Sequence, residues 1–236
     1  MKKEFIDSIK SRGYWRINFR PVALATDDAL SLNACEDVIS QSAVRLRGWD
    51  YPHIPGRRGD DTGIERHDKF VQGWVDWMNH REFWRMYTSS QFLHYRALHE
   101  DWVERNQLVQ NTTQGIPETP VLGVLTNLWL IVEICEFLSR LVSQRGLYQD
   151  GVGLSLQFHS GPEARTLWIE DPMRVPFTYD RTTSATVISF ERTVTPAEVA
   201  DPKTLAAEVA RHIFDRFGWE PSDEQLAYDI DKLYHL

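Results

Sequence analysis

The chain has 236 residues, of which 42% are hydrophobic and 25% charged, with 34 acidic side chains against 26 basic ones. This length and composition predict one large or two small globular domains, and they exclude a collagen-like, low-complexity or intrinsically disordered chain. The net charge of −8 disfavours nucleic acid as a partner, because proteins that bind it through its phosphates usually carry a basic excess.

The two cysteines, Cys35 and Cys135, stand far apart, each within an apolar, helix-like pattern. This arrangement predicts buried free thiols rather than a disulfide or a zinc site, and a reducing, cytoplasmic compartment. The N-terminal segment lacks the pattern of a signal peptide, and the longest apolar run, 121–132, is too short to span a bilayer. We therefore expect a cytoplasmic protein that does not associate with membranes.

Alternating apolar and polar residues predict strands, and four-residue apolar spacing predicts helices. Both patterns occur in residues 1–110, which we interpret as an N-terminal α+β section. The strands expected there cover 14–20, 44–54, 70–78 and 82–96, the last with a helix as the alternative. The expected helices cover 27–43, with Asp27 as cap, and 97–108, while the Gly- and Pro-rich stretch 55–63 is expected to be a loop.

The polar stretch 110–119 is the best candidate boundary, and residues 119–236 form a second section, unless the two form one continuous domain. A long helix is expected from Thr119 to Gly146, with Pro120 at its first position. A three-strand meander follows at 152–159, 166–169 and 185–193, and capping-box patterns at Thr195 and Ser222 open the two C-terminal helices. The fold class is therefore α+β, with mixed or antiparallel sheets packed against a long central helix and the C-terminal helices.

Sequence motifs of catalysis are missing. The chain has no glycine-rich nucleotide loop, no G-x-S-x-G nucleophile turn and no acidic strand motif of a metal-dependent nuclease. Its eight histidines form neither H-E-x-x-H nor H-x-x-x-H, and the rings of His94 and His99 would lie on different faces of a helix or a strand. We expect no metal and no cofactor, and these absences favour a non-catalytic protein.

One candidate site is the segment from Arg45 to His53, R-L-R-G-W-D-Y-P-H. On a strand, Arg45, Arg47, Trp49 and Tyr51 would share one face, with Asp50 on the other. Guanidinium, aromatic, carboxylate and imidazole groups together suit a pocket for a planar or anionic ligand. The alternative is a strand edge whose aromatics belong to the core and whose Asp50 caps a turn.

A second candidate lies on the long helix, where Glu133, Glu136 and Arg140 recur on one face. They form either salt bridges on the solvated side or a buried polar cluster that pairs with arginines of the first section. Five of the nine tryptophans and many arginines fall within residues 45–105, which makes this region the expected contact surface. The complete set of predicted ligand- or partner-binding residues is Arg47, Trp49, Asp50, Tyr51, His53, Arg85, His94, Glu133 and Arg140.

The segment Arg47–Ile54, R-G-W-D-Y-P-H-I, resembles a segment of poorly characterised bacterial proteins that accompany Schlafen-like AlbA DNA-binding modules. The similarity includes Trp15 to Pro21, Gln91 to His94 and the helix from Glu133 to Arg140. The resemblance implies a bacterial, cytosolic protein linked to regulation or anti-phage defence, and it implies no catalytic residue.

Three functions remain open from the sequence. The favoured one is a non-catalytic sensor or accessory protein that binds a protein partner or a small ligand through the 47–53 region. The first alternative is a hydrolase or transferase whose acid and base, Asp50 with His53 or Glu133 with His94, meet only in three dimensions. The second is contact with single-stranded nucleic acid through the arginines and aromatics of residues 45–105.

Overall fold

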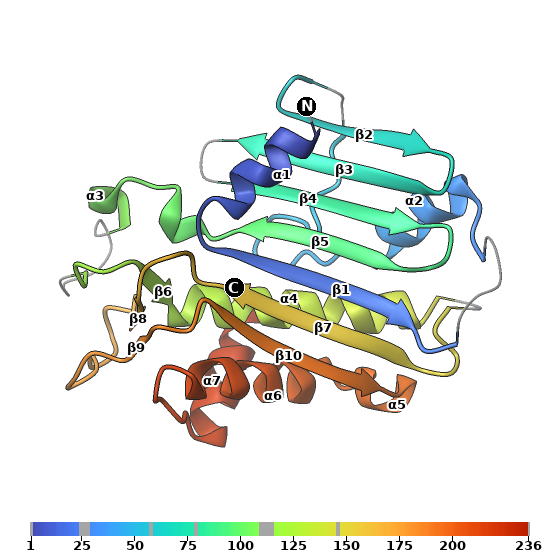
Figure 1. Ribbon diagram of the computed structural model, residues 1–236. Helices are drawn as coiled ribbons and strands as arrows, with labels where there is room; N and C mark the ends of the chain where they lie inside the picture. Colours follow the sequence, from blue (N-terminus) through green and yellow to red (C-terminus); the bar gives the residue numbers. More distant parts are fainter. Residues whose placement is uncertain are drawn as a thin grey trace.

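The computed structural model describes residues 2–23, 29–56, 59–77, 80–108, 116–144 and 147–235. Its main element is a seven-stranded antiparallel sheet in the order β10-β7-β1-β5-β4-β3-β2 (Figure 1). Its strands are β1 (Tyr14–Pro21), β2 (Thr62–His67), β3 (Phe70–Trp77), β4 (His80–Tyr87), β5 (Phe92–Ala97), β7 (Val152–His159) and β10 (Val187–Val194).

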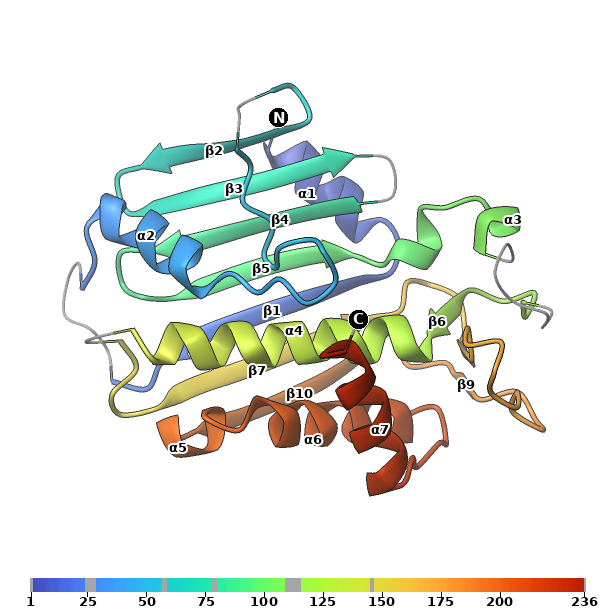
Figure 2. The ribbon, with the colours of Figure 1, turned by 180° about the vertical axis from the view of Figure 1, so that it is seen from behind.

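Helices cover the two faces of this sheet unequally. Helix α1 (Lys2–Lys10) lies on one face (Figure 1), and α2 (Leu32–Ser42) and α4 (Val124–Val142) lie on the other (Figure 2). The C-terminal helices α5 (Pro196–Val199), α6 (Pro202–Asp215) and α7 (Asp223–Leu233) pack around α4 and β10. This arrangement confirms the α+β class and the long central helix.

A small second sheet joins three short strands near the start of α4. Strand β6 (Val121–Gly123) pairs in parallel with β8 (Arg165–Trp168), which pairs with β9 (Thr182–Thr183). The sequence had predicted that β8 forms a meander with β7, and this is wrong, because β8 belongs to the small sheet. Two short helical turns, η1 (His99–Asp101) and α3 (Arg105–Leu108), follow β5.

Strand alternation explains the main core. Trp15, Ile17 and Phe19 of β1 are fully buried and point toward α4, whose apolar side chains are buried almost all round. Strand β1 lies between β5 and β7, so strands from both sequence sections form one sheet. Cys35 and Cys135 are both buried free thiols, as predicted.

Most of the predicted elements are confirmed, but the helix at 97–108 is wrong and the long helix begins later than predicted. Residues 97–108 form only η1 and α3, since Leu98 and Trp102 pack separately against the two cores. The long helix begins at Val124, because Val121–Gly123 pair with β8 as a strand; Thr119 and Pro120 precede it. Both C-terminal capping boxes are present as predicted.

Helix α2 is shorter than expected. It begins at Leu32, and the hydroxyl of Ser31 caps it by accepting a hydrogen bond from the Ala34 amide. The predicted cap, Asp27, lies outside the described residues.

Strand β3 contains a glycine whose missing side chain leaves space for a tryptophan. Gly73 pairs with Trp84 of β4, and a Cβ on Gly73 would lie 2.4 Å from two atoms of the Trp84 indole. This indole is buried and donates a hydrogen bond to the His53 carbonyl oxygen at 2.9 Å. Gly73 therefore supports the segment that carries the predicted site.

Substitution Gly73→Ala should lower the free energy of unfolding by about 1 to 3 kcal/mol, because the new methyl group overpacks the core against Trp84. Urea denaturation followed by tryptophan fluorescence measures this loss. The matched control is Gly56→Ala, since a Cβ there meets no atom within 4 Å. Equal stability of the two variants would contradict the packing role of Gly73.

Candidate functional site

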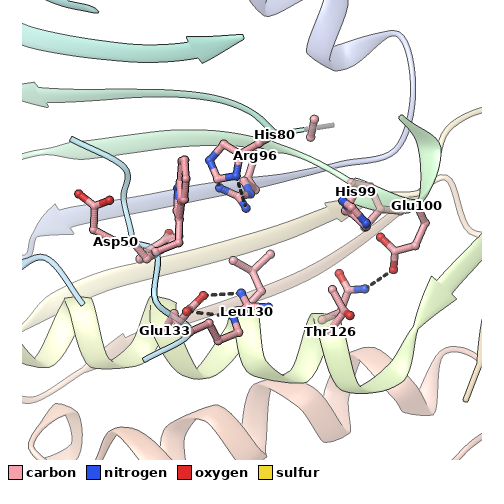
Figure 3. Close-up of a pocket in the computed structure, with 14 residues that line it drawn as sticks. Asp50, His80, Arg96, His99, Glu100, Thr126, Leu130 and Glu133 are labelled. Atoms are coloured by element: carbon pink, nitrogen blue, oxygen red, sulfur yellow. Dashed lines mark hydrogen bonds and ion pairs between the residues drawn. The ribbon is translucent and has the colours of Figure 1, made fainter. Parts of the chain in front are cut away.

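A cleft of about 310 Å³ lies between α4, the end of β5 with η1, and the segment 47–51 (Figure 3). Its floor is apolar, formed by Leu98 and Leu130, and its wall includes Trp49, whose surface is 40% exposed. Figure 3 places Asp50 near one end and Glu100 at the other. The volume is near the lower limit for pockets that bind small molecules.

The segment 44–54 is not a strand, which corrects the prediction. Its ladder is limited to a single bridge between Val44 and Tyr51, and the residues between them form a loop in which Gly48 has φ of +74°. A glycine tolerates this left-handed conformation, which would be unfavourable for other residues within a strand. The side chains of this segment therefore do not alternate between two faces, and Arg47, Trp49, Asp50 and Tyr51 all line the cleft.

Asp50 closes a turn at one end of the loop. Its Oδ1 lies 2.6 Å from Nδ1 of His53, and its Oδ2 accepts a hydrogen bond from the Ile54 amide at 3.0 Å. Burial alone would raise the pKa of Asp50, but these hydrogen bonds outweigh it and lower the pKa below its usual value. The His53 ring stacks on Trp49 at 4.6 Å, and Trp49 meets Trp77 edge to face at 5.6 Å.

Beneath this loop, Glu82 of β4 lies fully buried on the core face of the sheet. One of its oxygens accepts a hydrogen bond from the His53 amide at 2.6 Å, and the other forms an ion pair with Arg96 of β5. His80 and His94 lie 3.6 and 3.5 Å from the same carboxylate. Burial by itself would raise the pKa of Glu82, but Arg96 and the two imidazoles hold it well below its usual range.

The two histidines beside Glu82 are held mainly as neutral rings. Burial lowers the pKa of His94, and burial together with the charge of Arg96 lowers the pKa of His80. Nδ1 of His94 lies 2.9 Å from the hydroxyl of Tyr51, whose pKa is raised by burial. His94 is therefore part of the support beneath the cleft and does not line it.

The arginine of the first section that pairs with the long helix is Arg47. Its Nε and Nη2 donate to the two oxygens of Glu133 at 3.0 and 2.5 Å, and Glu133 is buried. The alternative in which the helix carboxylates pair with an arginine of the first section is therefore correct for Glu133. Glu136 accepts a hydrogen bond from Tyr234 and forms the predicted intrahelical pair with Arg140 at 4.0 Å, and the exposed Arg140 also donates to the Ala43 carbonyl oxygen.

Arg85 lies away from the other predicted site residues. In the register of β4 it alternates with Trp84, so it points to the opposite face of the sheet from the cleft. There it donates to the Gln72 side chain and stacks on Phe70 at 4.0 Å. The tryptophans are divided in the same way, since Trp74 and Trp102 pack with α1 on that face.

At its far end the cleft is lined by a residue that sequence reasoning did not select, Glu100 of η1. Oε1 of Glu100 accepts hydrogen bonds from the Gly123 amide at 2.7 Å and from Nδ2 of Asn127 at 2.8 Å. Oε2 is buried and has no hydrogen-bond partner among the described residues. Figure 3 shows this carboxyl turned into the cleft.

A second carboxyl, Glu170, lies beside Glu100. Its oxygens accept hydrogen bonds from the amides of Leu125 and Thr126, in the first turn of α4. A Cβ on Gly123 would lie within 3 Å of oxygens of both carboxyls, so the two groups flank this glycine. Burial and the charge of Glu170 raise the pKa of Glu100 to about 7, and burial also raises the pKa of Glu170.

Sequence signals exist for part of what was missed. Glu82, Trp84 and Met86 are spaced two residues apart in β4 and therefore share one face of the strand. A carboxylate among these apolar side chains could have been noticed in the sequence. Glu100 and Thr126 carry no such signal, since their positions depend on how η1 meets the start of α4.

Comparisons with known proteins give no match to a protein-family model, to a curated protein or to a solved structure. Within the described residues, no group of three or more histidine, cysteine, aspartate or glutamate side chains is arranged to hold a metal ion. Over the same ranges, no helix is long and apolar enough to cross a membrane. The proposal below therefore depends on the geometry of the cleft.

Substitution Glu82→Gln should lower the free energy of unfolding by about 3 to 5 kcal/mol, because it leaves the largely buried Arg96 without its counter-ion. Chemical denaturation at pH 7 measures this change. The matched control is Glu36→Gln, which breaks an exposed ion pair with Arg66 and should change stability little. Similar small effects of both substitutions would show that Glu82 is not needed to hold this part of the fold.

Glu100 should make stability fall as the pH rises. Between its ordinary pKa of 4.5 and its folded value of about 7, the folded protein keeps a proton that the unfolded chain has lost. This difference costs on the order of 3 kcal/mol by pH 8. Glu100→Gln cannot titrate, so its stability relative to the wild type should increase from pH 4.5 to 8, as measured by denaturation at each pH. A constant difference across this range, as expected for the exposed control Glu163→Gln, would contradict the assignment.

Proposed function

We propose that this protein binds a small, at least partly planar ligand in the cleft, as a non-catalytic sensor or accessory protein. The observation that carries this proposal is the cleft itself. It combines an apolar floor, an exposed indole and a buried carboxyl with an unpartnered oxygen. Pockets for small molecules combine apolar and aromatic surface with polar groups that fix orientation, and this cleft has both, although most of its lining residues are polar or charged.

Trp49 is the residue most suited to contact such a ligand. Its ring is supported by His53, Trp77 and His80, at centroid distances of 4.6, 5.6 and 5.0 Å, yet it remains 40% exposed. An indole that is held in place and exposed offers a large contact area at little entropic cost. Asp50 and His53 affect the ligand indirectly, because Asp50 holds the His53 ring and this ring stacks on Trp49.

The anionic part of the original hypothesis loses support. Of the two arginines that line the cleft, Arg47 is bound to Glu133 and Arg96 to Glu82. An anionic ligand would have to compete with a carboxylate for either guanidinium, and the displaced carboxylate would remain buried. The planar part of the hypothesis is kept.

An acid–base enzyme is the second candidate, and the contact between Asp50 and His53 favours it. Asp50 holds the imidazole and the Ile54 amide together, which is also the arrangement of a turn. The other predicted pair lacks support, because Arg47 binds both oxygens of Glu133 while His94 contacts Tyr51 and Glu82. We therefore prefer binding to catalysis.

Contact with single-stranded nucleic acid receives less support than ligand binding. Among the described arginines of the 45–105 region, Arg47 and Arg96 face α4 while Arg85 points to the other face of the sheet, so these three do not share a surface. The first two are also neutralised by glutamates. A place in bacterial regulation or anti-phage defence is supported by the resemblance of the Arg47–Ile54 segment alone.

Ligand binding is tested with a panel of small planar probes, namely adenosine, uridine, tryptophan, tyramine and benzoate. We expect at least one to raise the Tm and to show saturation-transfer NMR signals, and Trp49→Ala to weaken its binding about tenfold or more. Tyr228→Ala, which removes an exposed aromatic ring on α7, is the control and should leave binding unchanged. The proposal is wrong if no probe binds at millimolar concentration, or if the probes that bind have the same affinity for Trp49→Ala as for the wild type.

A further inference from the structure

The charges around the cleft are balanced at one end and unbalanced at the other. Near the 47–51 loop, each cleft arginine has its own buried glutamate, as Arg47–Glu133 and Arg96–Glu82. At the far end, Glu100 and Glu170 lie on either side of Gly123, and neither forms an ion pair with a described residue.

The nearest cation at that end is already committed. Arg165 of β8 donates to both oxygens of Asp101 at 2.9 and 2.7 Å, and also to the carbonyl oxygens of Ser160 and Val121. The charge of Arg165 acts to lower the pKa of Glu100, but burial and the charge of Glu170 have larger effects in the opposite direction, so the pKa is raised overall. The other charged or titratable groups close by are His99 and Arg96, which line the same cleft.

The backbone satisfies Glu170 but not Glu100. Two amides of the first turn of α4 bind Glu170, one to each oxygen. Glu100 receives both of its hydrogen bonds on Oε1, so the buried Oε2 keeps its full capacity to accept one more. A buried acceptor without a partner is costly, and a donor brought by a ligand would remove that cost.

We infer that the ligand of the cleft is a small organic cation, with an ammonium, amidinium or guanidinium group that donates to Oε2 of Glu100 and an apolar or aromatic body that lies along Leu98 and Leu130 toward Trp49. This inference rests on the proposed binding function and adds the chemical class of the ligand. The cation would supply the positive charge that Glu100 and Glu170 lack, while the indole of Trp49, at the other end of the cleft, would contact the apolar body of the ligand.

The test uses phenylalkylamines with one to four methylene groups, together with the alcohols and carboxylic acids of the same lengths. The three series share the phenylalkyl body and carry a cationic, a neutral or an anionic head group at pH 8, and chain length is varied so that the ring can reach Trp49 while the head group reaches Glu100. Isothermal titration calorimetry at pH 8 measures their Kd values. We expect the best amine to bind at least tenfold more tightly than its matching alcohol, and the acids to bind most weakly.

The preference for the amine should depend on Glu100 and on its proton. Glu100→Gln should reduce the amine-to-alcohol ratio to near one, while the exposed control Glu163→Gln should keep it. Lowering the pH from 8 to 5.5 should weaken amine binding and leave alcohol binding unchanged, because Glu100 then takes up a proton and loses its charge.

The outcomes separate the two proposals. If amines and alcohols bind equally well and both require Trp49, the inference is wrong and the binding function stands. If the acids bind most tightly, or if Glu100→Gln leaves the amine preference intact, the inference is also wrong. If no compound of any charge or length binds, the inference is wrong, and the proposed binding function is then decided by the separate panel of planar probes.

Discussion

The cleft depends on one buried carboxylate, Glu82. A charge on the core face of a sheet is tolerated only when partners replace water, and Glu82 obtains them from Arg96, two imidazoles and the His53 amide. The last of these contacts connects the sheet to the loop that carries Trp49 and Asp50. The ion pair within the sheet and the position of the loop are therefore parts of the same arrangement.

The start of α4 shows how two carboxyls can cap one helix end. The first amides of a helix have no partner within it, and here Glu100 and Glu170 accept hydrogen bonds from those of Gly123, Leu125 and Thr126. Two carboxyls are more negative charge than one helix end stabilises. Glu100 relieves this excess by keeping a proton up to a pKa of about 7, and because Glu100 lines the cleft, the two ends of the cleft differ chemically.

Much of the fold follows from local patterns, and the exceptions have identifiable causes. Alternation located β1, β3, β7 and β10, because one face of each strand contacts a core while the other is more polar. The same alternation in residues 44–54 was misleading, since Gly48 turns the chain and the backbone of Tyr51 forms only one bridge, to Val44 of the same segment. The helix predicted from Thr119 begins later, because Val121–Gly123 pair with β8, a strand distant in sequence.

By itself, the sequence determined the α+β class, the buried cysteines and the capping boxes, since these depend on residues close together in the chain. Only the tertiary structure decided which charges meet. It paired Arg47 with Glu133, placed Arg85 on the opposite face and brought Glu100 beside Glu170. The physical reason is that ion pairing and burial depend on distances through space, which register and helix packing set and which no local pattern records.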